Sequence, residues 1–544
     1  MKPFDAARRD LLRLGSMGLA ASSLPAFAAT TNPAPDASHE AIFNVRMYGA
    51  TGDGKTVDSA AINKAIEAAA AAGGGTVVVP AGTYVCFSIR LKSHVGLYLS
   101  HGSTIVAADS PKPGETTGYN GGVYDAAEPL PGWDAYQDFG HSHTQNSLIW
   151  GEGLTDVSIT GPGLIYGKGL SMGESGNRGG YVQYTMDQPG VGNKSIALRN
   201  CRNVVFRDFS MLKTGHLGLL ITGVDNVLMD NITMDTDRGG IDISCCRNVT
   251  VTNCNINSPW DDAICLKSSL ALGYLRDTQN VTISNCVVSG SYVMGTVLDG
   301  TFKVYPPDPP GTRIGRLGRI KLGTESNGGF KNIAITNCMF DGCMGLAIET
   351  ADGARVEDIV VSNLTMRDVV NCPIFLRLGA RLRGPLESTK PGTLKRVLIS
   401  NVCASNSAAG FSSILSGIPG HAIEDVKIAD VYVEHVGGGT TKQAALRPLE
   451  RENIYPEPRM FGDTPSHGFY VRHVNRLEMS HVEIAPKAAD VRPAFYLEDV
   501  HRADFIAVTA PSPAFSLNAV TDLRILLSRA APDTTLSSVD SKVI

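Results

Sequence analysis

Two adjacent carboxylates, Asp261 and Asp262, follow a Pro-Trp corner and precede a short apolar run, Ala263–Leu266, that ends in Lys267. Like charges this close disfavour joint ionisation, so we expect one carboxyl to have a raised pKa and the other to stay ionised. Such a pair provides an acid and a base from one residue type. The alternative interpretation is an ordinary surface turn, because aspartate is a common turn residue.

Arg319 and Lys321 form a second group that can take part in chemistry. They lie two residues apart, so on a strand their side chains project from the same face. A guanidinium can bind a uronate carboxylate through two parallel hydrogen bonds, and an ammonium adds a point charge. We therefore expect this pair to bind an acidic sugar, with Lys267 lowering the pKa of one aspartate. A solvated cationic edge is the alternative.

The elements that must position these side chains form a repeat. Short apolar units recur at steps of 23 residues (203 to 226) and 22 residues (226 to 248), and later steps lengthen to 32 (248 to 280) and 52 (280 to 332). One unit cannot bury its apolar residues alone, whereas stacked units form a continuous interior. The pattern predicts an all-β fold, a right-handed parallel β-helix. The units begin at Asn203, Asn226, Asn248, Asn280, Asn332 and Asp358.

Asparagine recurs at the unit boundaries, and several times a cysteine follows it. Asparagine tolerates left-handed backbone, and its amide both donates and accepts hydrogen bonds, so we expect a side-chain ladder along the stack. We interpret the cysteines as small buried fillers rather than disulfide partners or metal ligands. No metal site and no cofactor is predicted. The pairs are Asn200-Cys201, Asn253-Cys254, Asn285-Cys286 and Asn337-Cys338.

The first segment is typical of an export signal. Two arginines at 8 and 9 precede an apolar run (14–24) and a small-residue cleavage pattern (26–28), as in twin-arginine signal peptides. We predict a signal peptide over residues 1–28, a linker over 29–41 and one β-helix catalytic domain over 42–544. The expected location is periplasmic or secreted, reached through the twin-arginine export machinery, with no membrane contact after signal removal.

An alanine-rich stretch near the start of this domain, Ser59–Ala72, predicts a helix that covers the first coil, with Asp58 as its N-cap. The composition permits a large core, because 43% of the residues are hydrophobic. The formal net charge of −5 argues against a nucleic-acid partner, which would favour a basic face.

Taken in order, these features resemble glycoside hydrolase family 28, the polygalacturonases and their rhamnogalacturonan-active relatives. The likeness runs from about Phe43 to about Thr509. It rests on Tyr48-Gly49-Ala50, the strand Val79–Tyr84, the coil pattern, Asp261-Asp262 and Arg319-Ile320-Lys321. The resemblance implies inverting hydrolysis of a uronate-containing, pectin-type polysaccharide, galacturonan or rhamnogalacturonan. It makes Asp261 the general acid, and Asp262 helps to hold the attacking water.

The family's first motif supplies a third carboxylate, whose counterpart here is open. Counting back from Asp242 places Gly239 where the family has aspartate, whereas a shifted match selects Asp237. Asp237 is our third catalytic candidate, Asp242 is the next, and Glu325 is a further substitute. The predicted substrate-binding residues are Arg319, Lys321, Asp242, Lys267, His216 and Glu325, although His216 is also interpretable as a structural histidine.

Two other functions remain open. A β-helix polysaccharide lyase would abstract a proton beside the uronate carboxylate, generally with an acidic calcium site and a basic residue, and its product would absorb in the ultraviolet. A glycan-binding solenoid without turnover would follow if the first-motif carboxylate were lost. Fold alone does not choose among these functions.

Overall fold

The structure is a computed structural model that describes residues 41–129, 132–172, 187–306, 316–408 and 410–544. The predicted signal peptide (1–28) and all but the last residue of the predicted linker (29–41) lie outside the described residues. Residues Ala41–Ile544 form one compact unit. Within the described ranges, no helix is long and apolar enough to cross a membrane.

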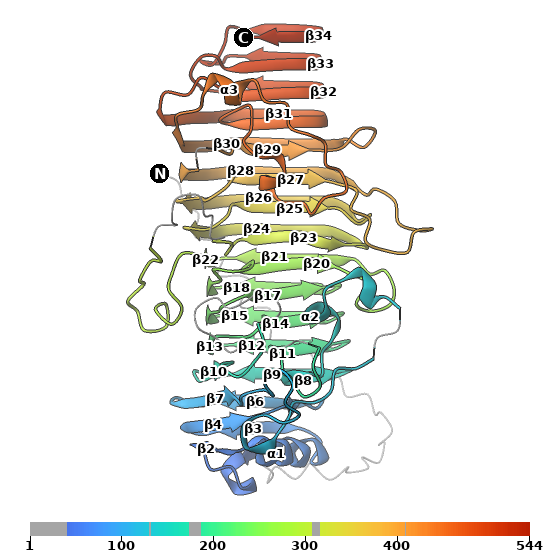
Figure 1. Ribbon diagram of the computed structural model, residues 1–544, viewed down its shortest axis with the longest axis vertical. Helices are drawn as coiled ribbons and strands as arrows, with labels where there is room; N and C mark the ends of the chain where they lie inside the picture. The colour runs from blue at the N-terminus through green and yellow to red at the C-terminus, as the bar shows by residue number, and fades with distance from the viewer. Residues whose placement is uncertain (1–40, 130–131, 173–186, 307–315, 409) are drawn as a thin grey trace, which may run out of the picture. The chain divides into compact units, whose positions relative to one another are not determined.

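Parallel strands stack coil upon coil along one axis in this unit (Figure 1). Several predicted site residues lie on the strands of one sheet, here called the cleft sheet. Each strand of this sheet pairs in parallel with the next. Its strands are β8 (Ser147–Glu152), β11 (Lys194–Arg199), β14 (Leu217–Thr222), β17 (Gly239–Ser244), β20 (Ile264–Ser268), β23 (Ile320–Ser326), β25 (Leu346–Thr350), β27 (Ile374–Leu378) and β29 (Ser413–Ser416).

The other strands complete the coils. In the earlier coils the repeat units form β9 (Thr155–Thr160), β12 (Arg202–Arg207), β15 (Asp225–Asp230), β18 (Arg247–Thr252) and β21 (Thr278–Ser284). Short third strands follow them: β10 (Leu164–Tyr166), β13 (Ser210–Leu212), β16 (Thr233–Asp235), β19 (Asn255–Asn257) and β22 (Val287–Ser289). Later coils fuse the two into β24 (Gly329–Asp341), β26 (Arg355–Arg367), β28 (Thr393–Ser407) and β30 (Ile423–Gly437).

A helix covers the first coil, which protects exposed strand edges, and the stack ends in an antiparallel edge strand. The first strands are β1 (Ile42–Asn44), β2 (Asp53–Val57), β3 (Gly75–Val79), β4 (Gly82–Cys86), β5 (Ile89–Arg90), β6 (Val95–Leu99) and β7 (Ser103–Ala107), and helix α1 (Ser59–Ala71) packs against them. The last are β31 (Phe469–Ala488), β32 (Phe495–Ile506), β33 (Phe515–Leu526) and the antiparallel β34 (Thr534–Val543). The predicted capping helix is confirmed. Asp58 is its N-cap residue, but its carboxylate accepts hydrogen bonds from Thr51 and Gly52 instead of from the helix.

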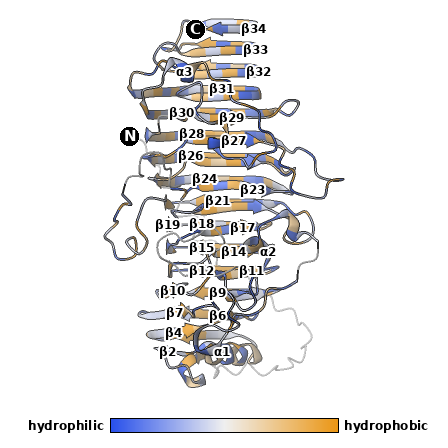
Figure 2. Ribbon diagram, viewed as in Figure 1, coloured by the Kyte–Doolittle hydropathy of each residue, from blue (hydrophilic) through white to orange (hydrophobic). Residues whose placement is uncertain are grey.

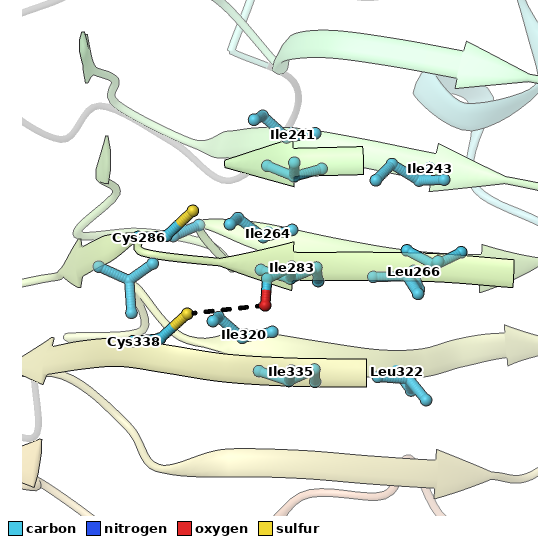
Figure 3. Packing of buried hydrophobic residues seen from close by; sticks show 14 of the residues in the cluster. Ile241, Ile243, Ile264, Leu266, Ile283, Cys286, Ile320, Leu322, Ile335 and Cys338 are labelled. Atoms are coloured by element: carbon cyan, nitrogen blue, oxygen red, sulfur yellow. Dashed lines mark hydrogen bonds between the residues drawn. The ribbon is translucent and has the colours of Figure 1, made fainter. Parts of the chain in front are cut away.

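The alternation of apolar and polar residues builds the interior (Figure 2). Ile241, Ile264 and Ile320 lie in register on β17, β20 and β23 and point inward (Figure 3). The residues between them, such as Asp242 and Lys267, therefore project from the outer face of the cleft sheet. The interior fixes the register, and the register fixes which side chains reach the outer face together.

The predicted asparagine ladder is present. Asn226, Asn248, Asn280 and Asn332 have positive φ angles, and each donates to the asparagine one coil earlier at 2.9–3.0 Å. All eleven cysteines are free thiols, ten of them buried and Cys403 exposed. Cys286 and Cys338 lie beside the isoleucine stack (Figure 3), as expected for apolar fillers.

Candidate functional site

A narrow cleft lies on the outer face of the cleft sheet over β17, β20 and β23. Two segments far away in sequence also contribute to its lining, α2 (Phe139–Ser142) and the loop that carries Tyr455. The lining residues with ionisable side chains are Asp138, His141, Arg238, Asp242, Asp261, Asp262, Cys265, Lys267, Glu325 and Tyr455. Five predicted site residues therefore meet in one place: Asp242, Asp261, Asp262, Lys267 and Glu325.

The structure places Gly239, the residue that counting from Asp242 puts at the first-motif position, at the start of β17. Two residues later on this strand, Ile241 pairs with Ile264 of β20. A Cβ at Gly239 would lie 2.5 Å from Leu217 Cδ2. The leucine side chain therefore fills the space that a carboxylate at position 239 would need.

Asp237, the predicted third catalytic residue, is not brought together with the pair. It is buried, it is absent from the described lining of the cleft, and burial raises its pKa to about 7. Its neighbour Asp235 anchors the loop after β22, because its carboxylate accepts from Gly295 N at 2.7 Å and Val297 N at 3.1 Å. The Asp235–Asp237 segment thus supports the loop rather than the cleft floor.

Asp262 is held by cations from β23. Arg319 Nε donates to Asp262 Oδ1 at 2.8 Å, and Lys321 Nζ lies 3.6 Å from Oδ2. Burial alone would raise the Asp262 pKa, but the charges of Lys321 and Arg319 hold it below its usual value. Arg319 also bonds Glu457, which comes from a loop 138 residues later. This network keeps Asp262 ionised.

Arg319 and Lys321 are consequently not free to bind substrate in this structure. Arg319 is fully buried and Lys321 nearly so, and neither belongs to the described lining of the cleft. Lys321 also lies 3.6 Å from the Glu349 carboxylate. The cations that do line the cleft are Arg238 and Lys267.

Asp261 is the more accessible member of the pair, with 27% of its side chain exposed against 8% for Asp262. Its Oδ1 accepts from Asp262 N at 2.9 Å, and its Oδ2 accepts from Arg238 Nε at 3.1 Å. Arg238 also donates to His216 Nδ1 at 3.0 Å. Burial, followed by the charge of Arg238, holds the His216 pKa well below its usual value. His216 therefore supports Arg238 from behind and does not itself belong to the described lining.

A second charged group lines the same cleft. Glu325 lies 2.9 Å from His141 Nδ1 and 2.9 Å from Lys267 Nζ. Although burial acts the other way, His141 and Lys267 hold the Glu325 pKa well below its usual value. Asp242 Oδ2 lies further from the same two cations, at 3.9 Å and 3.8 Å, and burial raises the Asp242 pKa to about 6.

One metal-like grouping occurs among the described residues. Asp138, His141 and Glu325 place potential ligand atoms within 4.8 Å of one another. The Lys267 ammonium, however, already bonds Glu325 and would repel a bound cation. The donor set therefore does not fit a metal site, and we derive no metal chemistry from it.

A larger cavity of about 670 Å³ lies beside the cleft and shares Glu457 with the Asp262 network. Its lining includes Arg316, Tyr292, Asn371 and Arg459 but none of the cleft carboxylates. Aromatic, amide and guanidinium groups suit sugar binding, whereas acid and base catalysis requires the carboxylates of the cleft. We therefore place the chemistry in the cleft.

Sequence reasoning missed His141, Arg238, Tyr455 and Glu457 as site residues. These four side chains enter from connections rather than from the repeat, so no periodic pattern marked them. The sequence did hold one signal against Asp237 as the third catalytic residue, because counting from Asp242 already placed Gly239 at the first-motif position.

Comparisons with known proteins agree with this architecture. A family model described as rhamnogalacturonase A/epimerase, pectate lyase-like, matches residues 42–127. A model of right-handed β-helix regions matches residues 169–272 and 190–383, which confirms the predicted fold class.

Two curated relatives have pectin-related names. A probable polygalacturonase of Vitis vinifera is 25% identical over 337 residues, covering 59% of this chain and 60% of that protein. An exo-poly-alpha-D-galacturonosidase of Dickeya chrysanthemi is 25% identical over 280 residues, covering 44% of this chain and 43% of that protein. The matched region thus spans less than two thirds of either relative. The crystal structure of an exopolygalacturonase from Thermotoga maritima shares the fold, with a TM-score of 0.55 and 16% identity over 82% of this chain and 91% of that one.

Proposed function

Because this chain belongs to glycoside hydrolase family 28, we propose that it hydrolyses O-glycosidic bonds in a pectin-type polysaccharide, galacturonan or rhamnogalacturonan, with inversion of configuration. The observation that carries the proposal is the cleft itself, in which Asp261, Asp262 and Asp242 face one space beside two cations. Inverting hydrolysis requires one protonated carboxyl and one carboxylate, with roughly 6.5–9.5 Å between them for the sugar and a water.

The charges of the cleft also support an acidic substrate. Arg238 and Lys267 line it together with His141, and a guanidinium binds a carboxylate through parallel hydrogen bonds. We assign uronate recognition to Arg238 and Lys267, which line the cleft, in place of Arg319 and Lys321, which do not. The substrate chain would continue into the adjoining cavity past Glu457.

Proton NMR of the first product tests this proposal on polygalacturonate and on rhamnogalacturonan. The expected result is a saturated reducing end whose anomeric configuration is the reverse of that of the bond cleaved. An unsaturated product that absorbs in the ultraviolet, formed only without chelator, would establish the lyase instead.

Glycan binding without turnover is the second candidate. Counting from Asp242 puts Gly239 at the first-motif position, and this glycine, which lies against Leu217, supplies no carboxylate there. Calorimetric binding of oligogalacturonate with no product at any pH between 4 and 8 would support it.

Export through the twin-arginine machinery to the periplasm or the medium is part of the proposal, on the pattern at residues 1–28. Replacing both Arg8 and Arg9 by lysine should leave the protein in the cytoplasm of a producing cell. Unchanged export of that variant would contradict the assignment.

A further inference from the structure

The larger cavity beside the cleft is joined to the aspartate corner by one short segment. Leu317 N donates to Pro259 O at 3.1 Å, and Gly318 N donates to Asp261 O at 2.8 Å, so this segment lies against the corner. Arg316, the residue just before it, lines the cavity of about 670 Å³. Cavities of this size hold small ligands in many proteins. A saccharide chain bound at the corner therefore has the cavity within reach.

Two arginines of the cavity lining have no carboxylate partner among the described residues. Arg459 lies on the 3-10 helix η4 (Pro458–Phe461), where its exposed side chain stands between buried neighbours. Within the described ranges its guanidinium has neither a hydrogen-bond partner nor an ion-pair partner. The guanidinium of Arg316 donates only to a backbone oxygen, Pro306 O, at 3.0 Å. Both side chains thus keep unused N–H donors at the cavity.

The carboxylates of the same described lining cannot take up these donors without losing partners of their own. Each of them already accepts a hydrogen bond. The pairs are Arg367 to Asp341, Asn406 to Asp368 and Arg319 to Glu457. A guanidinium with free N–H groups favours a ligand carboxylate, which it binds through two parallel hydrogen bonds. The free donors of Arg316 and Arg459 therefore point to an acidic ligand.

The rest of the wall suits a sugar. Tyr292 OH donates to Asp341 Oδ2 at 2.6 Å, which holds the aromatic ring in the wall. Asn371 Oδ1 accepts from Gly345 N at 2.9 Å, which leaves the amide N–H groups of this side chain for a ligand. An aromatic ring packs against the C–H face of a sugar, and an amide binds its hydroxyl groups. Sugar and carboxylate together define a uronate.

We propose that this cavity is a second uronate-binding site, in which Arg316 and Arg459 bind carboxylates of a galacturonan segment that extends beyond the aspartate corner. The inference rests on the proposed function, because it takes the substrate to be a pectin-type chain. The two arginines need not meet on one carboxylate, since galacturonan carries a carboxylate on every sugar residue. The site adds affinity for the acidic chain and does not touch the bond that is cleaved.

Calorimetry of hexagalacturonate binding tests this site. The measurements use an Asp262→Asn background, so that the ligand is not consumed. Arg459→Gln should weaken the binding about 10-fold, the lower end of the range for a hydrogen bond to a charged group. Arg316→Gln should also weaken it, and the double variant should bind more weakly than either single variant.

A carboxyl-reduced hexamer, which has the same linkages and no charge, separates charge recognition from shape. Its binding, followed by NMR titration, should be equal with and without Arg459→Gln. Arg529→Gln is the matched control and should bind hexagalacturonate as the Asp262→Asn background does. Arg529 is also exposed and has no side-chain partner among the described residues, but it is absent from the described lining of the cavity.

Circular dichroism establishes that each variant is folded. The inference alone is overturned if Arg459→Gln binds hexagalacturonate as tightly as Arg529→Gln, or if Arg459→Gln loses affinity equally for both hexamers, while the parent cleaves a pectin-type polymer. If the affinities change as expected but the parent cleaves neither polygalacturonate nor rhamnogalacturonan, the proposed hydrolysis fails and the uronate site stands.

Discussion

Replacing Arg319 by methionine should weaken the fold far more than the same change at a surface arginine. Arg319 bonds both Asp262 and Glu457 and is fully buried. Arg476 also bonds one aspartate and one glutamate, but 40% of its side chain is exposed. Arg476→Met therefore differs from Arg319→Met chiefly in burial and is the matched control.

The expected magnitudes follow from what each change leaves behind. Without Arg319, two buried carboxylates are left with Lys321, which lies 3.6 Å from Asp262 and 4.0 Å from Glu457. Breaking a buried pair from one side costs about 3–5 kcal/mol. The exposed pairs of Arg476 contribute at most about 1 kcal/mol, and salt screens them.

Urea unfolding at pH 7, followed by tryptophan fluorescence, measures both losses, since Trp260 lies two residues before Asp262. The Arg319→Met loss should be the same in low and high salt, whereas the smaller Arg476→Met loss should shrink further in high salt. Equal losses in the two variants would refute the claim that the buried network holds the corner.

Three further results are expected. The melting temperature of Asp237→Asn relative to that of the parent should rise between pH 4 and pH 8. The parent loses stability over this range, because folded Asp237 retains its proton up to pH about 7 while the unfolded chain releases it near pH 4. An equal difference at pH 4 and pH 8 would contradict this. Asn226→Ala should lose about 2 kcal/mol in urea, through two ladder bonds and a positive φ, and Asn226→Gly less; equal losses would exclude the backbone contribution. Thiol titration should detect one cysteine, Cys403, in the native protein and eleven after denaturation, whereas several reactive native thiols would contradict the buried filler role.

The coil architecture was predictable because its determinants are local and repeated. Asn226 and Asn248 occur one coil apart, and each needs only its counterpart in the next coil to bond. The same holds for the inward isoleucines of β17 and β20. Such positions recur at every turn, so the sequence shows their period without knowledge of any distant contact.

The functional roles were less predictable because the cleft is completed by distant connections. His141 meets Glu325 across 184 residues, and Glu457 meets Arg319 across 138. The strand pattern correctly placed Arg319 and Lys321 on one face, but it could not show that a later loop would cover them. A charge that looks available to substrate in sequence is here neutralised by the protein's own carboxylates.

The most direct test of the central claim compares the parent with Asp262→Asn on polygalacturonate and rhamnogalacturonan, with oligosaccharide binding measured beside product formation. The account predicts saturated reducing products from the parent on at least one polymer. From the variant it predicts loss of turnover with binding retained. Undiminished turnover in the variant, or unsaturated products from the parent, would contradict it.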